Sequence, residues 1–384
     1  MRLGTRAHLA AAAMFVVSAG LDASAFASAQ DKVSTVMEIG GSKLAVSLQE
    51  MRALSALGNL ARGAQSARQD RALADARRIA NSRDARFALA LYELEIGNRR
   101  GDDVMRAGAL DILIASPLTR PERLAGHLAV RGQIAFRAGD LDMAGRSWGR
   151  LAELAPSDPD ALANLAQVRL AQKDAPGAMD LLTRAIAARA ALGQPVAEGW
   201  YRQRLSIAQQ GSLVAPGIDA ARGLVGAYPT PENWRIALVV YRQLAAAEGA
   251  LEIDLFRLTR QVGALAQAAE YQRMAQLLNQ TGEPREAKAV LGEGVKRGLL
   301  DAAISPTREI MAEVERAIAK ARPGTVARPE PPSAAGAQVR LGVARLNAGQ
   351  RGEAEAAFRA AAGDPAGGRY ADLGFFWLTW LGRG

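Results

Sequence analysis

A repeat spacing of about 34 residues constrains the fold of this chain more than any other feature of its sequence. When the segment that begins at Gly126 is laid over the segment that begins at Asp160, small and large side chains coincide at the same offsets. A fixed period of this length is typical of repeat proteins, in which each unit buries its apolar face against the next. The matched pairs are Gly132 with Ala166, Ala144 with Ala178, Trp148 with Leu182, and Leu151 with Ala185.

Each of these units has the pattern of two helices joined by a short turn. Ala144, Trp148 and Leu151 are spaced at i, i+4 and i+7, so they form one stripe along a second helix that faces the first. Gly139 and Asp140 are typical of a helix end followed by the N-cap of the next helix. Ala and Leu, which both favour helix, dominate the composition. These patterns predict an all-α fold.

Two further units carry the pattern, one from Glu270 and one from Gln338, and less regular copies lie after Ala85 and between Trp234 and Tyr241. The sequence resembles the tetratricopeptide repeat (TPR) family. That resemblance implies an α-α superhelix, a solenoid of helix-turn-helix repeats, over residues 48–321 and again over 338–384. The matching positions in the two later units are Ala275, Gly282, Ala287 and Leu291, and Gly342, Gly349, Ala354 and Phe358.

The resemblance also implies where a partner binds. In TPR proteins the first helices of successive pairs line a concave groove, which takes protein or peptide partners. Amide side chains can bond to the N–H and C=O groups of an extended peptide, and arginines can pair with carboxylates. The alternative is that these side chains form an ordinary solvated face. The positions carried over from the family are Gln133, Arg137, Gln167, Arg235, Arg242, Gln243, Gln272, Gln276 and Asn279.

Residues 1–29 have the pattern of an export signal. Arg2 and Arg6 precede an apolar run over residues 9–20, and residues 27–29 form an A-x-A cleavage site. The sequence therefore predicts a cleaved Sec-type signal peptide and a periplasmic or secreted protein. The apolar run is shorter than the roughly 20 residues of a spanning helix. We expect no transmembrane segment after cleavage.

The residue counts exclude several kinds of chemistry. The chain has no cysteine and two histidines, and His8 lies in the predicted signal. Thiol catalysis, thiolate metal sites and histidine clusters are therefore excluded, and we expect no cofactor or metal. The net charge of +9 comes from scattered residues. Solvated helix faces explain it, with polyanion binding as the alternative and no nucleic-acid partner expected.

One pentapeptide resembles a catalytic motif. Residues 145–149, GRSWG, fit the Gly-x-Ser-x-Gly pattern of the α/β-hydrolase nucleophile elbow. That elbow needs a strand before the serine and a histidine later in the chain, whereas a helical pattern precedes Ser147 and His127 comes earlier. We interpret Ser147 as an incidental helix residue. No other catalytic constellation is present, so the sequence predicts a protein that is not an enzyme.

Three segments lie outside the main repeats. Residues 30–47 contain two β-favouring runs around Gly40 and Gly41, which predict either a flexible N-terminus or a β-hairpin whose edge pairs with a partner. Residues 322–337 contain four prolines and are predicted to be a linker. Residues 338–384 are predicted to form one more repeat and a final helix. In that helix Phe376, Trp377 and Trp380 either cap the core or dock a partner.

These features predict a non-enzymatic scaffold or adaptor of the cell envelope. It binds protein or peptide partners in its groove and serves envelope assembly, secretion or polysaccharide export. The alternative is a helical-superstructure subunit of a cell-wall or polysaccharide-processing enzyme, because such enzymes resemble this chain in architecture.

Overall fold

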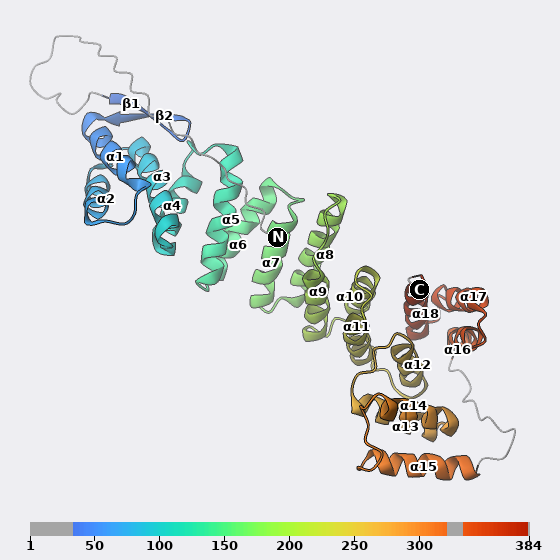
Figure 1. Ribbon diagram of the computed structural model, residues 1–384. Helices are drawn as coiled ribbons and strands as arrows, with labels where there is room; N and C mark the ends of the chain where they lie inside the picture. The colour runs from blue at the N-terminus through green and yellow to red at the C-terminus, as the bar shows by residue number, and fades with distance from the viewer. Residues whose placement is uncertain (1–33, 321–332, 383–384) are drawn as a thin grey trace, which may run out of the picture. The chain divides into compact units, whose positions relative to one another are not determined.

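The computed structural model describes residues 34–320 and 333–382, which form eighteen helices and one two-stranded sheet (Figure 1). This confirms the predicted fold class, a TPR-like helical solenoid with a short hairpin. The described residues fall into two compact units, which divide between Lys173 and Asp174. The predicted export signal, residues 1–29, lies outside the described residues.

The first unit contains the hairpin and seven helices, and the second unit contains eleven helices within the described ranges. The elements of the first unit are β1 (Ser34–Ile39), β2 (Ser42–Ser47), α1 (Leu48–Ala61), α2 (Ala67–Ile79), α3 (Arg83–Arg100), α4 (Asp103–Ala115), α5 (Pro121–Arg137), α6 (Leu141–Leu154) and α7 (Pro159–Ala171). Those of the second unit are α8 (Ala175–Ala191), α9 (Glu198–Gln210), α10 (Val214–Ala227), α11 (Pro231–Leu244), α12 (Gly249–Gln261), α13 (Ala268–Gln280), α14 (Pro284–Lys296), α15 (Thr307–Lys320), α16 (Ala334–Asn347), α17 (Arg351–Ala362) and α18 (Arg369–Leu381).

One kind of turn joins the two helices of most pairs. A residue with positive φ follows the first helix, and the next N–H donates to a carbonyl near the end of that helix. In the α5–α6 turn, Gly139 has φ 78° and Asp140 N–H bonds to Ala135 C=O over 2.9 Å. This Schellman geometry satisfies the carbonyl groups at the helix end. The same hydrogen bond recurs at Asp102, Leu213, Ala247, Glu283 and Gln350.

The small and large positions of the repeat meet inside these pairs. A Cβ atom built on Gly132 in α5 would lie 2.4 Å from Nε1 of Trp148 in α6. The same contact joins Gly342 in α16 to Phe358 in α17, where the distance from such a Cβ to the ring would be 2.5 Å. Only glycine, which has no Cβ atom, leaves room for the ring of the second helix so close to the backbone of the first. The sequence pattern of small and large residues therefore reports helix packing.

The hairpin of the first unit covers the first helices. β1 and β2 pair antiparallel from Ser34 opposite Ser47 to Ile39 opposite Ser42. Gly40 and Gly41 have φ of 60° and 79°, as a two-residue type I′ turn requires. The apolar side chains of the hairpin pack into one core with α1 to α4. The sequence left a flexible N-terminus and a hairpin as alternatives, and the structure has the hairpin.

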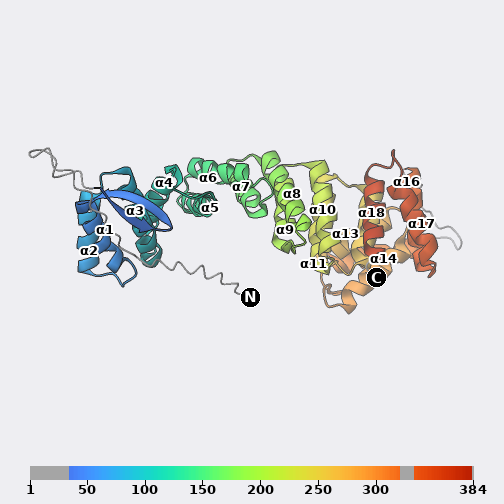
Figure 2. The ribbon, with the colours of Figure 1, turned by 90° about the horizontal axis from the view of Figure 1, so that it is seen from above.

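Two cores lie side by side in the second unit and share α12. One core joins α9 to α12 with α16, α17 and α18, and Leu255 of α12 belongs to it. The other joins α13, α14 and α15, and Phe256 of α12 belongs to it. In both views α18 lies beside α10 (Figures 1 and 2). α18 therefore packs on α17, within the last repeat as the sequence predicted, and also on α10 and α12.

The predicted linker is shorter than expected at its C-terminal end. α16 begins at Ala334, and Ser333 caps it by accepting a hydrogen bond from Gly336 N–H over 3.0 Å. Residues 334–337, which the proline-rich pattern assigned to the linker, are therefore helical. Residues 321–332 lie outside the described residues.

None of the helices in the described ranges combines the length and the apolar character that crossing a bilayer requires.

Candidate protein-binding surfaces

First helices of neighbouring pairs contact one another through equivalent positions. In the second unit, Gln209 of α9 donates from Nε2 to Oε1 of Gln243 in α11 over 2.6 Å, and the two residues are 34 positions apart. Asn233 of α11 donates to Glu198 of α9 over 3.0 Å. We call one set of side chains on α9 and α11 the first-helix face of the second unit. It consists of Glu198, Gln209, Asn233, Arg235 and Gln243.

In the first unit the predicted groove residues are accessible. Gln133 and Arg137 of α5 are exposed, and Gln167 of α7 is half-buried. Arg137 pairs with Asp103 of α4 over 3.0 Å. Both side chains of that ion pair are open to solvent, so it contributes little stability and leaves Arg137 able to exchange partners.

The second unit gives its predicted residues different roles. Arg235 is half-buried and Gln243 is exposed. The Arg242 guanidinium lies over the ring of Phe256, 5.1 Å from its centre, and 3.8 Å from the buried carboxylate of Glu252. Arg242 is therefore held by α12, and its charge is already partly neutralised there. Arg235 and Gln243 are the more available members of this set.

The predicted residues of α13 contribute to packing. Gln272 donates to the buried hydroxyl of Thr307 in α15 over 3.0 Å. Gln276 and Asn279 are half-buried, and the buried Oδ1 of Asn279 has no hydrogen-bond partner among the described residues. Because α15 takes the amide of Gln272, this part of the predicted groove is the least open to a peptide.

The C-terminal aromatic residues lie in the core. Phe376 and Trp377 are buried, and Phe376 packs against Tyr241 with ring centres 5.2 Å apart. Trp377 stacks on Phe358 at 5.0 Å. Trp380 is half-buried beside Trp377. The alternative in which these rings dock a partner therefore does not apply to Phe376 and Trp377 in this structure, since almost none of their surface is presented to solvent.

A buried charge network on α12 was missed by the sequence analysis. The carboxylate of Asp254 accepts hydrogen bonds from Arg257 at 2.8 Å, from Arg340 at 3.1 Å and from the Tyr370 hydroxyl at 3.2 Å. Burial opposes the charge of Arg257, but the carboxylates of Glu286, Asp254 and Glu283 outweigh burial and raise the pKa of Arg257. The available signal was an aspartate between Ile253 and Leu255, since charged residues are seldom found in an apolar stretch unless they are paired.

The structure gives Ser147 no nucleophile geometry. Ser147 lies within α6, and only 4% of it is exposed. His127 lies in α5, and burial together with the nearby charge of Arg123 lowers its pKa. Ser147 is therefore a helix residue, as interpreted from the sequence. Across residues 34–320 and 333–382, no group of three or more acidic, histidine or cysteine side chains is placed to hold a metal ion.

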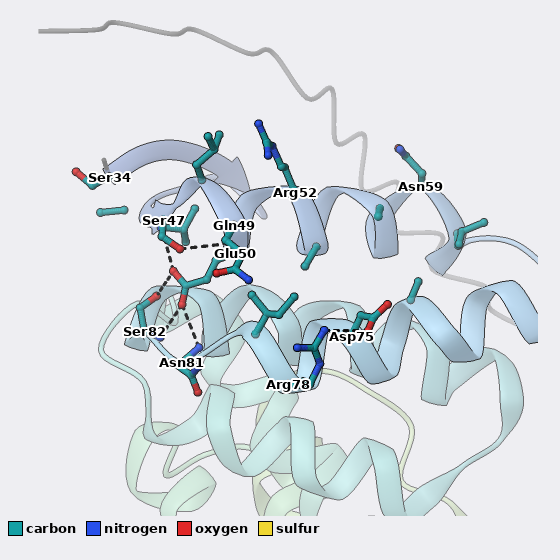
Figure 3. Close-up of a pocket in the computed structure, with 18 of the residues that line it drawn as sticks. Ser34, Ser47, Gln49, Glu50, Arg52, Asn59, Asp75, Arg78, Asn81 and Ser82 are labelled. Atoms are coloured by element: carbon teal, nitrogen blue, oxygen red, sulfur yellow. Dashed lines mark hydrogen bonds and ion pairs between the residues drawn. The ribbon is translucent and has the colours of Figure 1, made fainter. Parts of the chain in front are cut away.

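An open groove lies between the hairpin, α1 and α2 (Figure 3). Arg52, Arg68 and Arg78 line it, and Asp75 pairs with Arg78 over 3.3 Å. At one end the buried Glu50 connects the two walls. The capping box that starts α1 can be recognised in the sequence. The groove cannot, because its second wall is formed by α2 and the turn after α2, which fold against α1 only in three dimensions.

Glu50 is held by four hydrogen bonds. It accepts from the backbone N–H groups of Ser47, Asn81 and Ser82 at 2.8–3.0 Å and from the Ser82 hydroxyl at 3.1 Å (Figure 3). Burial raises the pKa of Glu50, but these hydrogen bonds outweigh burial, so the pKa lies below the ordinary value. The ionised carboxylate therefore ties the start of α1 to the α2–α3 turn.

We expect Glu50→Gln to destabilise the first unit by about 1–2 kcal/mol at pH 7, because the amide keeps only one acceptor oxygen. A lowered pKa means that the carboxylate stabilises the fold above the ordinary value of 4.5 and loses this effect as the pH falls through the folded pKa. The difference from the parent protein should therefore narrow below about pH 4.5. Urea unfolding at several pH values measures it, with Glu153→Gln on α6 as the control. A difference that does not change with pH would contradict this account.

The chain is similar to several solved structures of helical repeat proteins. No family model and no curated protein matches the chain. A tetratricopeptide repeat protein from Parabacteroides merdae is similar over 76% of this chain and 99% of its own, with 14% identity and a TM-score of 0.36. The TPR domain of P58(IPK) is similar over 87% and 98%, with 11% identity and a TM-score of 0.29. A chain of the APC/C hetero-tetramer Cut9–Hcn1 is similar over 86% and 58%, with 13% identity and a TM-score of 0.28.

The geometry of the chain itself shows the repeat. Asp140 and Asp174 are the N-caps of second helices in consecutive units, one repeat period apart. Leu213 and Ala247, at the same spacing, donate the hydrogen bond that closes the turn in their own pairs. The same contact of a small residue with a large one recurs in both units. The protein is a TPR-like array of helical pairs.

Proposed function

We propose that the protein is a non-enzymatic scaffold that binds an extended peptide segment of a partner protein on the first-helix face of the second unit. The envelope location of this scaffold is also a proposal. It is supported by the pattern of residues 1–29, whose basic start, apolar run and A-x-A site are those of an export signal.

The pairing of Gln209 with Gln243 is the observation that best supports this function. Two amide side chains from successive first helices meet at 2.6 Å and are both exposed. Each amide can still donate and accept further hydrogen bonds, as an extended peptide backbone requires. The half-buried Arg235 lies on α11 as well and can pair with a carboxylate of the peptide.

The test compares partner capture by two charge variants of the mature protein. Arg235→Glu with Gln243→Glu reverses the charge of the first-helix face, and Glu at 243 keeps an acceptor for Gln209. We expect this variant to recover partners from envelope extract at least about fivefold less well, because losing a central arginine of an interface costs about 1 kcal/mol or more. Arg242 is left unchanged because it is held against α12.

A matched control carries Arg285→Glu and Arg316→Glu at exposed positions of α14 and α15. It should recover the same partners as the parent protein. Equal capture by both variants would refute binding at the first-helix face. Capture that depends on salt and falls equally in both variants would indicate polyanion binding instead.

A further inference from the structure

The two-stranded sheet of the first unit has two edges, which differ in whether other parts of the chain bond to them. In an antiparallel pair, residues alternate between those that bond to the neighbouring strand and those whose backbone groups point outward. Ala45 N–H of β2 points outward, because it donates to the carboxylate of Asp84 in α3 over 2.9 Å. Val36 is the partner of Ala45 in the register, so its N–H and C=O also point outward, on the side of β1 away from β2.

Within the part of the chain that the structure describes, the edge of β2 is covered, whereas the edge of β1 is open. The outward backbone groups of Val36 and Glu38 have no hydrogen-bond partner among the described residues. Proteins usually protect such an edge with a proline, a bulge, a lysine or a covering segment. β1 contains no proline or lysine, and its register with β2 has no bulge. The side chain of Val36 is 61% exposed on this strand.

We propose that the open edge of β1 binds an extended segment of a partner protein as a third strand of the sheet. The segment has a β-branched apolar residue opposite Val36 and a lysine or arginine opposite Glu38. The backbone groups of Val36 and Glu38 supply the affinity, as in other cases of strand addition. This interaction does not depend on the first-helix face of the second unit.

The charge of the edge favours a basic segment over a second copy of this chain. Glu38 is the only charged residue of β1, and its neighbour across the hairpin is Lys43. If two copies paired antiparallel about Val36, each Glu38 would face Ser34 of the other copy and would gain no charged partner. A lysine or arginine in the added strand gives Glu38 an opposite charge directly across the pair, which stabilises strand pairing.

The test uses a labelled heptapeptide, Ser-Lys-Thr-Val-Thr-Lys-Ser, with blocked ends and the chain of residues 30–384. When the peptide pairs antiparallel to β1 with its valine opposite Val36, one of its lysines lies opposite Glu38. We expect binding in a fluorescence anisotropy titration. Replacing both lysines of the peptide by glutamate should weaken binding about fivefold. Methylating the valine nitrogen should weaken it about tenfold or more, because that N–H bonds to the edge.

Two variants of the protein locate the site. Val36→Pro removes an outward N–H that the hairpin does not use, so the melting temperature should stay unchanged while binding is lost. Val36→Thr is its matched control and should bind as the parent does. Glu38→Lys should reverse the preference, so that the glutamate peptide binds better than the lysine peptide, and it tests the same edge if Val36→Pro fails to fold.

Three results would overturn the proposal. The first is equal binding of the lysine and glutamate peptides to the parent protein. The second is unchanged binding by a folded Val36→Pro protein. The third is a dimer of the parent protein, seen in sedimentation, that dissociates on Val36→Pro, since a second copy would then occupy the edge.

Discussion

Replacing Asp254 with alanine should lower the free energy of unfolding of the second unit by about 3–5 kcal/mol. Asp254 is 2% exposed and accepts hydrogen bonds from Arg257, Arg340 and Tyr370. Arg257 keeps Glu283 and Glu286 when the aspartate is removed. Arg340 and Tyr370 lose the group that ties α16 and α18 to α12, and the buried Tyr370 hydroxyl is left without this acceptor. Denaturant unfolding, followed by tryptophan fluorescence, measures the loss.

Asp254→Asn should cost less than Asp254→Ala, because the amide oxygen still accepts one of the three hydrogen bonds. The matched control is Glu313→Ala, an exposed acidic position on α15, which should change stability by less than about 0.5 kcal/mol. In an Arg340→Met background the cost of Asp254→Ala should fall, since the two residues interact directly. An Asp254→Ala protein within about 1 kcal/mol of the parent would show that the network contributes little.

The helical pairs could be predicted from the sequence because their signals are local. Gly139 and Asp140 supply the turn, and Gly132 and Trp148 supply the contact between its two helices, all within one helical pair. The hairpin was left open between two alternatives because its signal is only partly local. Gly40 and Gly41 indicated a turn, but two short strands are stable only when their apolar face is covered, and α1 and α3 provide that cover.

The placement of α16 to α18 could not be predicted, because it depends on contacts distant in sequence. Phe376 packs on Tyr241, which lies far earlier in the chain, and Trp234 lies against the same Phe376 ring. The sequence indicates that a helix rich in aromatic residues will be buried, but it does not indicate which helices will cover it. The period indicated one more repeat at the end of the array, whereas these rings place that repeat on α10 to α12.

The candidate binding residues were predicted from their positions on a helix face. The position on the face does not determine whether a side chain is free to contact a partner. Gln133 and Gln243 are exposed, but Arg242 is drawn onto Phe256 and Gln272 is taken by Thr307. Those contacts come from the neighbouring helices, α12 and α15. A repeat period fixes the direction of a side chain and leaves open which element lies in front of it.

Position 132 should not tolerate a side chain larger than that of glycine. We expect Gly132→Ala to destabilise the first unit by about 2–3 kcal/mol, although alanine is the better helix former. The added Cβ would lie 2.4 Å from Nε1 of Trp148 and 2.6 Å from two further ring atoms. The ring cannot move freely, because Nε1 donates to Ala129 C=O over 3.1 Å and the ring packs on Phe136. Thermal or urea unfolding measures the change.

The other repeats indicate which second substitution should reduce the loss of stability caused by Gly132→Ala. Glycine faces a ring in the pairs Gly132–Trp148 and Gly342–Phe358, whereas Ala275 and the smaller Leu291 occupy the matching positions. Gly132→Ala should therefore cost much less in a Trp148→Leu background than in the parent protein, and this coupling is measured by a double-mutant cycle. Gly149→Ala on α6 is the matched control, because a Cβ there meets nothing within 4 Å. Equal costs of Gly132→Ala in both backgrounds would mean that the pairing of small and large residues does not set the helix spacing.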